Sequence, residues 1–307
     1  MRKHLETCPS NVSLAPWMTA SIIARVREVS VSSHAELADR FSALHCSGEP
    51  LLLPNPWDAG SARVLAWLGF EALATTSSGS AATLGLLDGE IGPELALEHA
   101  HTIVAATALP VSADLENGFA ADADGVAQTA RGAVQAGLAG FSIEDYSGDD
   151  EHPIYGIDEA AERVRAAAEV AHSGPARLVV TGRCENHLHG RDDLADTIAR
   201  LQAYQEAGAD VLYAPGPTDS AQIRSIIESV DRPVNVLARP GMAPVSELAE
   251  LGVARISVGG AFAFVAIDAL VAAGRELREH GTFGFAARAG PGARAAVAAF
   301  SSFTMPA

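Results

Sequence analysis

Eight short apolar runs recur along the chain, and each ends in polar or acidic residues before a stretch with helical spacing. The runs cover residues 51–55, 72–77, 110–116, 140–145, 177–183, 210–215, 233–238 and 255–260. Strands that alternate with helical segments predict parallel β-α-β units. Eight such units predict a closed (β/α)₈ barrel, or TIM barrel, whose active site lies at the carboxyl ends of the strands.

Charged and polar residues follow these predicted strands, and the barrel would bring them to one mouth. They are Asp58, Asp114, Glu116, Glu144, Asp145, Arg183, Glu185 and Asn235. Their clustering is the main indication of function.

Helical patterns follow the runs over residues 58–68, 93–106, 122–136, 158–171, 192–207, 219–229, 244–251 and 261–280. Several begin at Asp and end near Gly, for example Gly69 and Gly137. Asp is a preferred N-cap, and Gly favours the left-handed C-terminal cap. Ser33, followed by apolar residues at helical spacing, predicts a further helix over residues 33–46 that leads into the barrel.

The length allows one barrel with extensions. The chain has 307 residues, whereas about 250 suffice for the barrel. We expect an N-terminal extension with the leading helix at residues 1–47, the catalytic barrel at 48–285, and an Ala/Gly-rich tail at 286–307. The hydrophobic fraction of 48% and the charged fraction of 19% are typical of a globular protein with a large core.

Charge and cysteine content exclude several classes of protein. A net charge of −17 argues against nucleic acid as a partner. No apolar run approaches the roughly 18 residues of a membrane span, and no secretory signal is indicated. Cys8, Cys46 and Cys184 contain no CxxC pair, so neither a disulfide framework nor a zinc site is indicated. We therefore expect a cytoplasmic protein with no membrane partner.

Acidic residues gather where the third and fourth runs end. Asp114 and Glu116 are two residues apart, so on a continuing strand both would face the same side. Glu144 and Asp145 end the next run, and one of them faces inward. Several carboxylates at one mouth repel each other unless a cation lies between them, and oxygen-only ligands favour Mg²⁺ or Mn²⁺. A single acid could instead cap a helix or face solvent, but the set at adjacent strand ends favours a metal site.

Arg183 and Glu185 end the fifth run in TGRCENHLHG. A cation beside an anionic site suits a substrate carboxylate or a developing oxyanion, and the alternative is a structural Arg–Glu pair. His187 and His189 lie beyond the strand end without a third nitrogen or sulfur ligand, so we expect local loop contacts there. Cys184 follows Arg183 directly and should face the opposite way on a strand.

Two loops at the predicted mouth stand out. The polar, Gly/Pro-containing segment Tyr146–Gly156 is longer than most connections, so we expect a mobile lid. The hydroxyl-rich segment Thr75–Ser80 predicts a turn whose backbone N–H groups approach a carboxylate or phosphate. It is not a P-loop, because the GK[ST] ending is missing.

Several segments, in barrel order, resemble the isocitrate lyase/phosphoenolpyruvate mutase superfamily over roughly residues 48–285. They are LLLPNPWDAGSARVL, ALATTSSGSAATLGLLDGE, VSADLENGF, GFSIED, TGRCENHLHGRDD, AGADVLYAPG and VNVLARPG. The resemblance implies a magnesium-bearing barrel that stabilises pyruvate-like enolates while a C–C or P–C bond is made or broken. It also implies a tetramer in which a C-terminal helix, here Ala261–His280, is exchanged between neighbours.

The resemblance assigns roles to individual residues. It implies metal-site acids at Asp114, Glu116 and Glu144, a further site acid at Asp88, a substrate-binding arginine at Arg183, and a carboxylate-binding turn at Ser78 and Gly79. The lid departs from the family pattern, since it carries neither the cysteine of the lyases nor the lysine of the mutases. Cleavage of isocitrate or methylisocitrate by the usual route is therefore not expected. Tyr146, His152 and Tyr155 are the lid side chains that could substitute, and His152 titrates nearest neutral pH.

The resulting hypothesis is a Mg²⁺-dependent lyase that cleaves a C–C bond in a small 2-hydroxy or 2-oxo carboxylate. We expect catalytic roles for Arg183, Glu185, His152 and Tyr146, and substrate contacts from Ser78, Gly79, Asp88 and Asn235. Alternatives are a hydrolase of an oxaloacetate-like or phosphonopyruvate-like substrate and a phosphonomutase, which the missing lid lysine disfavours. A catalytically silent metabolite-binding barrel is a further alternative, against which the retained acids and Arg183 argue. We expect a homo-oligomer, a tetramer or a dimer.

Overall fold

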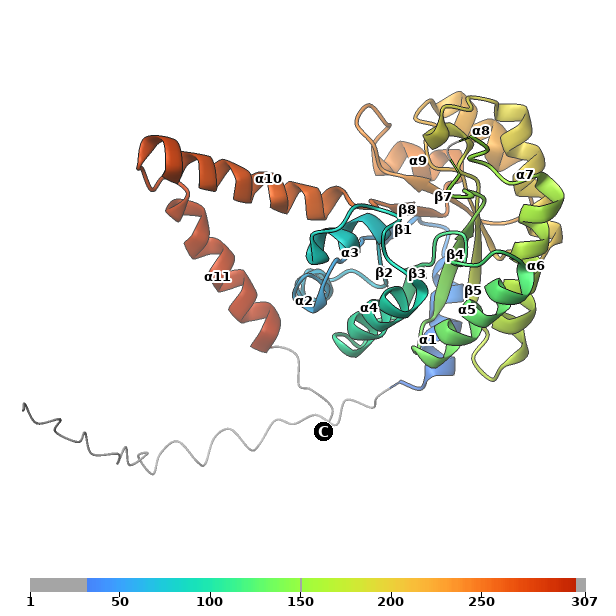
Figure 1. Cartoon of the computed structure of the whole chain (residues 1–307), viewed down its shortest axis with the longest axis horizontal. Helices are drawn as coiled ribbons and strands as arrows, with labels where there is room; N and C mark the ends of the chain where they lie inside the picture. The colour runs from blue at the N-terminus through green and yellow to red at the C-terminus, as the bar shows by residue number, and fades with distance from the viewer. Residues whose placement is uncertain (1–31, 150, 302–307) are drawn as a thin grey trace, which may run out of the picture. The chain divides into compact units, whose positions relative to one another are not determined.

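The computed structural model describes residues 32–149 and 151–301. Eight parallel strands form one sheet in the order β1-β8-β7-β6-β5-β4-β3-β2. Their bounds are β1 Leu51–Leu53, β2 Leu73–Ala74, β3 Val111–Asp114, β4 Gly140–Glu144, β5 Val179–Arg183, β6 Val211–Tyr213, β7 Val234–Leu237 and β8 Arg255–Ser257. The Ala74 N–H donates to the Pro54 carbonyl at 3.1 Å where β1 and β2 approach each other. The sheet is thus a nearly closed barrel (Figure 1), which confirms the predicted fold.

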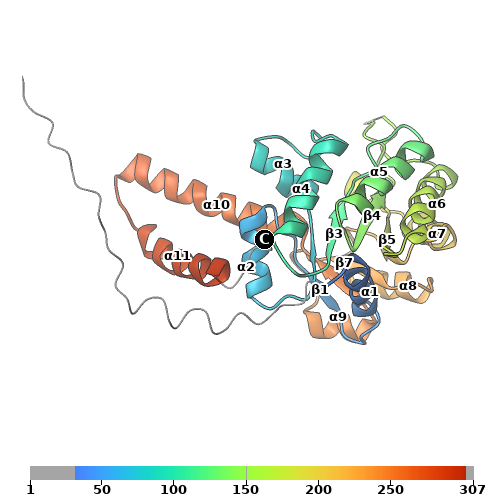
Figure 2. The ribbon, with the colours of Figure 1, turned by 90° about the horizontal axis from the view of Figure 1, so that it is seen from below.

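Helices follow the strands and surround the barrel in Figures 1 and 2. Their bounds are α1 His34–Leu44, α2 Ala59–Trp67, α3 Ser77–Leu84, α4 Pro93–Ala105, α5 Ala123–Gln135, α6 Ile157–Ser173, η3 Asn186–His189, α7 Leu194–Glu206, α8 Ser220–Glu228, α9 Val245–Leu251, α10 Ala261–Arg275, η4 Glu276–His280 and α11 Ala286–Ser301. Every helix predicted within the described part of the chain is confirmed. The predicted N-terminal extension lies outside the described residues as far as residue 31.

Two segments differ from the sequence expectation. The hydroxyl-rich segment Thr75–Ser80 was predicted to be a turn, but its residues from Ser77 onward form the first turn of the helix α3, with Thr76 as the N-cap residue. Asp58 does not face the mouth: it is the N-cap of α2, and its carboxylate accepts the Ser61 N–H at 2.6 Å. Satisfying a free N–H at a helix start is worth about 1 kcal/mol, which explains an Asp at this position without a catalytic role.

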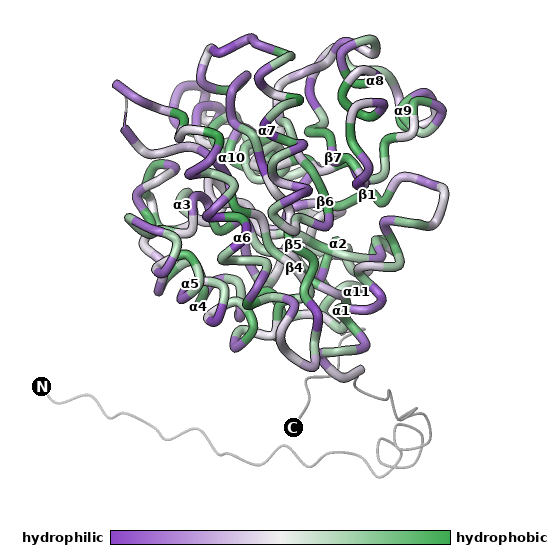
Figure 3. Tube along the Cα trace, turned by 90° about the vertical axis from the view of Figure 1, so that its right-hand side faces the viewer, coloured by the Kyte–Doolittle hydropathy of each residue, from purple (hydrophilic) through white to green (hydrophobic). Residues whose placement is uncertain are grey.

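The apolar core lies inside the barrel and between the sheet and its helices, and Figure 3 draws β4 and β5 largely as hydrophobic. Phe41 of α1 is completely buried against the amino-terminal parts of the strands, including Leu51 and Val179. A Cβ at Gly140 would meet the Val179 carbonyl at 2.6 Å and the Phe41 ring at 2.8 Å, so only glycine fits there. Apolar packing thus fills this end of the barrel and leaves the carboxyl end to polar side chains.

α10 and α11 extend beyond the barrel helices as a pair (Figures 1 and 2), and they pack against α3 and α2, respectively. Large apolar side chains on both helices remain exposed: Val265 is 67% exposed, Leu270 72% and Val297 66%. A soluble monomer rarely leaves so many such side chains in water. Each helix among the described residues is too short or too polar to be a membrane span.

Candidate active site

A cavity of about 200 Å³ lies inside the carboxyl end of the barrel. Polar side chains from most of the strands and from α3 line it, among them Asn55, Ser77, Ser78, Asp88, Asp114, Ser142, Arg183, Tyr213, Asn235, Arg255 and Ser257. The strands place these side chains there because alternate residues of a barrel strand point inward.

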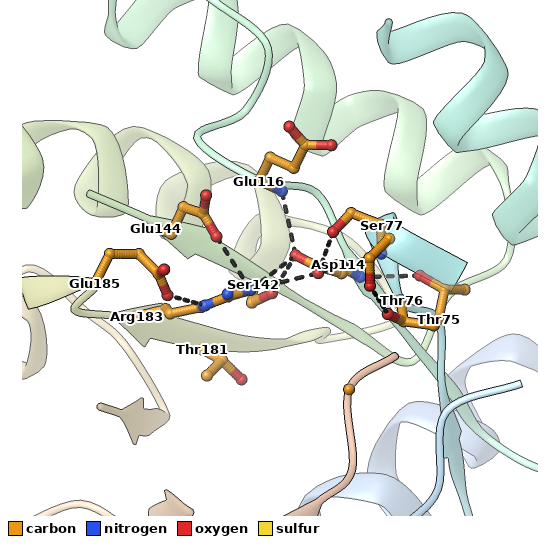
Figure 4. Close-up of polar contacts among 12 residues, drawn as sticks. Thr75, Thr76, Ser77, Asp114, Glu116, Ser142, Glu144, Thr181, Arg183 and Glu185 are labelled. Carbon is orange, nitrogen blue, oxygen red and sulfur yellow. Dashed lines mark hydrogen bonds and ion pairs between the residues drawn. The ribbon is translucent and has the colours of Figure 1, made fainter. Parts of the chain in front are cut away.

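Arg183, the last residue of β5, lies in the middle of the acidic residues (Figure 4). Its Nη1 is 3.0 Å from Glu144 Oε2 and 3.3 Å from Asp114 Oδ1, and its Nε donates to Glu185 Oε1. Burial alone would lower the pKa of Arg183, but the neighbouring carboxylates raise it well above its usual value. The guanidinium is therefore permanently charged and held from three sides.

Asp114 ends β3 and accepts hydrogen bonds from two neighbouring elements. Its Oδ2 accepts from the Ser77 hydroxyl at 3.1 Å and from the Ser77 N–H at 3.4 Å, at the start of α3. Its Oδ1 accepts from the Ser142 hydroxyl at 3.4 Å. The amino-terminal end of a helix favours negative charge, so the start of α3 suits an aspartate at this position.

Glu116 does not continue the strand. β3 ends at Asp114, and Glu116 has a φ of +47°, a left-handed conformation that residues other than glycine seldom adopt. The expectation that both acids share one strand face is therefore wrong, although both remain at the mouth (Figure 4). Burial, followed by the charges of Asp114 and Asp88, raises the pKa of Glu116 to about 8.

The donor set fits a hard divalent cation. Burial raises the pKa of Glu144, and removal from water together with the Asp114 charge raises that of Asp88. These acids repel each other, so a cation among them is needed to keep all of them ionised. Within the described residues, no three His, Cys, Asp or Glu side chains lie close enough to bind one ion directly. Mg²⁺ suits such a site because it commonly binds to one or two carboxylates and keeps several waters.

Asp145 faces away from the cavity, contrary to the expectation that it belongs to the mouth. It is 1% exposed and accepts hydrogen bonds from Tyr204 Oη at 2.6 Å, the Glu185 N–H at 2.7 Å and Arg200 Nη1 at 3.1 Å. It thereby fixes the backbone of Glu185, whose side chain holds Arg183. Cys184 is buried in the core and does not line the cavity, as its place beside Arg183 predicts.

The segment Tyr146–Gly156, which the sequence predicts to be a lid, contacts the site through a histidine. The Tyr146 ring stacks on His189 with centroids 4.0 Å apart, and His189 Nε2 lies 3.6 Å from Glu185 Oε2. His189, for which the sequence indicated only local loop contacts, thus connects the lid to Glu185. His152 does not lie with them: its side chain is 83% exposed and its Nδ1 lies 3.6 Å from Asp149.

Three of the four residues expected to contact the substrate line the cavity. Ser78, Asp88 and Asn235 line the cavity, whereas Gly79 does not. Gly79 is buried in the first turn of α3, where a Cβ would lie 2.6 Å from Thr76 Cγ2. The structure therefore gives Gly79 a packing role.

Sequence reasoning missed further polar residues of the cavity. These are Tyr213, Arg255 and Ser257. The Arg183 Cζ atom lies 5.3 Å from the centroid of the Tyr213 ring. The alternation of inward-facing and outward-facing residues along a predicted strand could have indicated these cavity residues. Arg255 and Ser257 are two residues apart and share the inward face of β8.

Comparison with known proteins agrees with this fold and site. The family described as phosphoenolpyruvate phosphomutase matches residues 41–278. The chain therefore belongs to the phosphoenolpyruvate mutase/isocitrate lyase superfamily.

Individual relatives carry different activities. A crystal structure of a protein from Burkholderia cenocepacia J2315, provisionally assigned as a lyase/mutase, is 50% identical with a TM-score of 0.83 and covers 85% of this chain and 95% of its own. An oxaloacetate decarboxylase of Pseudomonas entomophila (strain L48) is 31% identical over 252 residues, 78% of this chain and 83% of the relative. The structure of a 2,3-dimethylmalate lyase, a member of the same superfamily, is 28% identical with a TM-score of 0.73, over 81% of this chain and 89% of the lyase. The superfamily thus includes carbon–carbon lyases, and the substrate differs among its members.

Proposed function

We propose that this chain is a Mg²⁺-dependent carbon–carbon lyase that acts on a small 2-hydroxy or 2-oxo carboxylate. The observation that carries the proposal is the position of Arg183 between Asp114, Glu144 and Glu185 at the barrel mouth. One guanidinium cannot neutralise three carboxylates, so the cluster around Arg183 is anionic. An anionic substrate binds next to these carboxylates only if a further cation lies among them, which favours a metal-assisted reaction.

The residues divide into a metal-binding and an oxyanion-binding group. Asp114 would hold Mg²⁺, with Asp88, Glu116 and Glu144 around it. When bound, the ion supplies positive charge for the substrate carboxylate and the oxygen beside it. Arg183 donates to the carboxylates through Nε and Nη1, so Nη2 would donate to the oxygen on which negative charge develops.

Cleavage of a carbon–carbon bond leaves a carbanion that must take up a proton. Tyr146 is connected to the site through His189 and Glu185, whereas His152 pairs with Asp149 in solvent. Tyr146 is therefore our proposal for the lid group that takes part in proton transfer, ahead of His152. Its role matches the position of the lid in the family, although neither a cysteine nor a lysine is present there.

Oxaloacetate chemistry is the second candidate. It is favoured by the oxaloacetate decarboxylase that is 31% identical to this chain and by the absence of a lid cysteine or lysine, because water can complete a decarboxylation or a hydrolysis. A phosphonomutase is disfavoured by the missing lysine. A non-catalytic binding barrel leaves the arrangement of three carboxylates around Arg183 without a purpose.

The test is a panel of 2-oxo and 2-hydroxy acids incubated with the protein and Mg²⁺, with products identified by NMR. A lyase gives two carbon fragments from one acid, a decarboxylase gives carbon dioxide, and a mutase gives an isomer. We expect fragments that include pyruvate or another 2-oxo acid. No product from any acid, with a folded and metal-loaded protein, would contradict the proposal.

A further inference from the structure

Arg255 is a buried cation without an anionic partner. It is 4% exposed, and it lines the same cavity as Arg183 and Asp114. Its Nη1 bonds to His45 Nε2 at 3.2 Å and its Nη2 to Thr181 Oγ1 at 3.1 Å, while its buried Nε has no partner. Among the described residues, no carboxylate forms an ion pair with it.

The neighbours of Arg255 are neutral. Burial, with the Arg255 charge, lowers the pKa of His45 to about 3, so this imidazole is uncharged. His45 Nδ1 bonds to the Phe41 carbonyl at 2.8 Å, which leaves Nε2 as the acceptor for Arg255. Burial also lowers the pKa of Arg255, to about 10, and Arg255 therefore remains a cation at neutral pH.

The other buried arginines have anionic partners. Among the described residues, Arg183 lies among three carboxylates, Arg200 contacts Asp145 and Asp196, and Arg163 Nη2 lies 3.7 Å from Glu159 Oε1. An uncompensated buried charge destabilises a fold strongly, and packing alone would be served equally well by an apolar side chain. Arg255 is therefore explained best by an anion that binds from the cavity.

A second buried polar atom beside the cavity has no hydrogen-bond partner among the described residues. Asn235 lines the cavity beside Arg255 in the sheet, and its buried Oδ1 has no hydrogen-bond partner while its Nδ2 donates to Ser257. An unmet acceptor of this kind suits the hydroxyl group of a 2-hydroxy acid, whereas a carboxylate cannot donate to it. Neither atom belongs to the acidic cluster around Arg183.

The position of Arg255 relates it to the site already described. Arg183, Tyr213, Asn235 and Arg255 are register partners on successive strands. The Arg255 guanidinium donates a hydrogen bond to the Thr181 hydroxyl. Thr181 lies two residues before Arg183 on β5, and Figure 4 shows both side chains. Alternate residues of a strand are about 7 Å apart. A four-carbon diacid spans such a distance when both of its ends accept hydrogen bonds.

We propose that Arg255 and Thr181 bind the second carboxylate of a dicarboxylate substrate whose first carboxylate lies at Asp114 and Arg183. The place of the first carboxylate rests on the proposed function. The second site rests on the unpaired guanidinium alone. The substrate class is therefore a 2-hydroxy or 2-oxo dicarboxylate rather than a monocarboxylate.

Malate and lactate test this assignment, because they share the 2-hydroxy carboxylate and differ in the second carboxylate. Both are titrated into the Mg²⁺-loaded protein by calorimetry. We expect malate to bind at least about tenfold more tightly than lactate. Arg255→Gln should weaken malate binding about ten- to a hundredfold and change lactate binding less than about threefold, as expected for loss of a charged hydrogen bond.

Two further variants control for folding and for the loss of a buried arginine. Arg255→Lys keeps the charge and should give an intermediate loss for malate alone, so it decides the matter if Arg255→Gln does not fold. Arg163→Gln removes a buried arginine of α6 that bonds to backbone carbonyls outside this cavity, and it should leave the malate-to-lactate ratio unchanged.

The outcomes separate this proposal from the proposed function. Equal affinities of the unchanged protein for malate and lactate, or an equal loss of both in Arg255→Gln, would overturn the second carboxylate site. If no acid is cleaved but the preference for malate depends on Arg255, the site stands and the lyase assignment falls. If cleavage is found and Arg255→Gln leaves both affinities unchanged, the lyase stands and the site falls.

Discussion

Arg200 joins three parts of the carboxyl end of the barrel, and its removal should destabilise the protein strongly. The side chain is 3% exposed. Its Nε lies 2.7 Å from Asp196 Oδ2, and its Nη1 lies 3.1 Å from Asp145 Oδ2 and 2.7 Å from the Tyr155 carbonyl. It thus ties α7 to the end of β4 and to the base of the lid.

The expected magnitude follows from burial. Arg200→Met keeps much of the side-chain volume but leaves Asp145, which is 1% exposed, without its cation. Breaking a buried ion pair in this way costs about 3–5 kcal/mol. For a domain of this size each kcal/mol lowers the melting temperature by about 2–4 °C, so we expect a decrease of about 6–20 °C.

Thermal unfolding followed by circular dichroism measures this effect at fixed protein and Mg²⁺ concentrations. Arg177→Met is the matched control: Arg177 also pairs with an aspartate, Asp210, at 2.8 Å, but its side chain is 50% exposed. An exposed pair contributes at most about 1 kcal/mol, so the control should lose no more than about 4 °C. If both variants lose the same few degrees, the reasoning about the buried pair is refuted.

Three further predictions concern the site and the assembly. Asp114→Ala should abolish turnover and weaken Mg²⁺ binding in a calorimetric titration, yet leave the melting temperature within a few degrees, because the substitution removes one of several repelling carboxylates. Activity should require Mg²⁺ or Mn²⁺, with Zn²⁺ a poor substitute, and undiminished turnover after thorough chelation would refute the metal assignment. The protein should be a homo-oligomer, a tetramer or a dimer, through the exposed apolar faces of α10 and α11, and a monomer in light scattering at micromolar concentration would count against this.

Local patterns in the sequence were sufficient for the barrel. The strand runs alternate with helical segments that begin at Asp and end near Gly, and the observed strands lie inside the predicted runs. These signals are local, because caps and hydrophobic periodicity depend on residues a few positions apart. The parallel barrel then places every strand end at one mouth, and for this reason Asp114, Arg183 and Asn235 could be assigned to the cavity from their positions alone.

The direction of a side chain beyond a strand end could not be predicted in the same way. Glu116 was expected to share a strand face with Asp114, but the chain turns at a positive φ after β3. Asp58 and Asp145 carry the same charge as Asp114, yet one caps α2 and the other bonds to buried donors behind the sheet. The backbone turn and the surrounding donors decide these roles, and neither has a periodic signature.

Contacts between distant strands were decided only by closure of the barrel. The sequence predicted a strand that begins at Arg255, but it did not predict that this side chain lines the cavity. Only the closed sheet brings its guanidinium to Thr181 of β5 and to His45 after α1, and keeps it from every carboxylate of the described chain. The stacking of Tyr146 on His189 likewise depends on two loops that meet above the sheet. The physical reason is that hydrophobic periodicity specifies which face of a strand is buried, whereas the partner of a buried charge depends on how all the strands pack together.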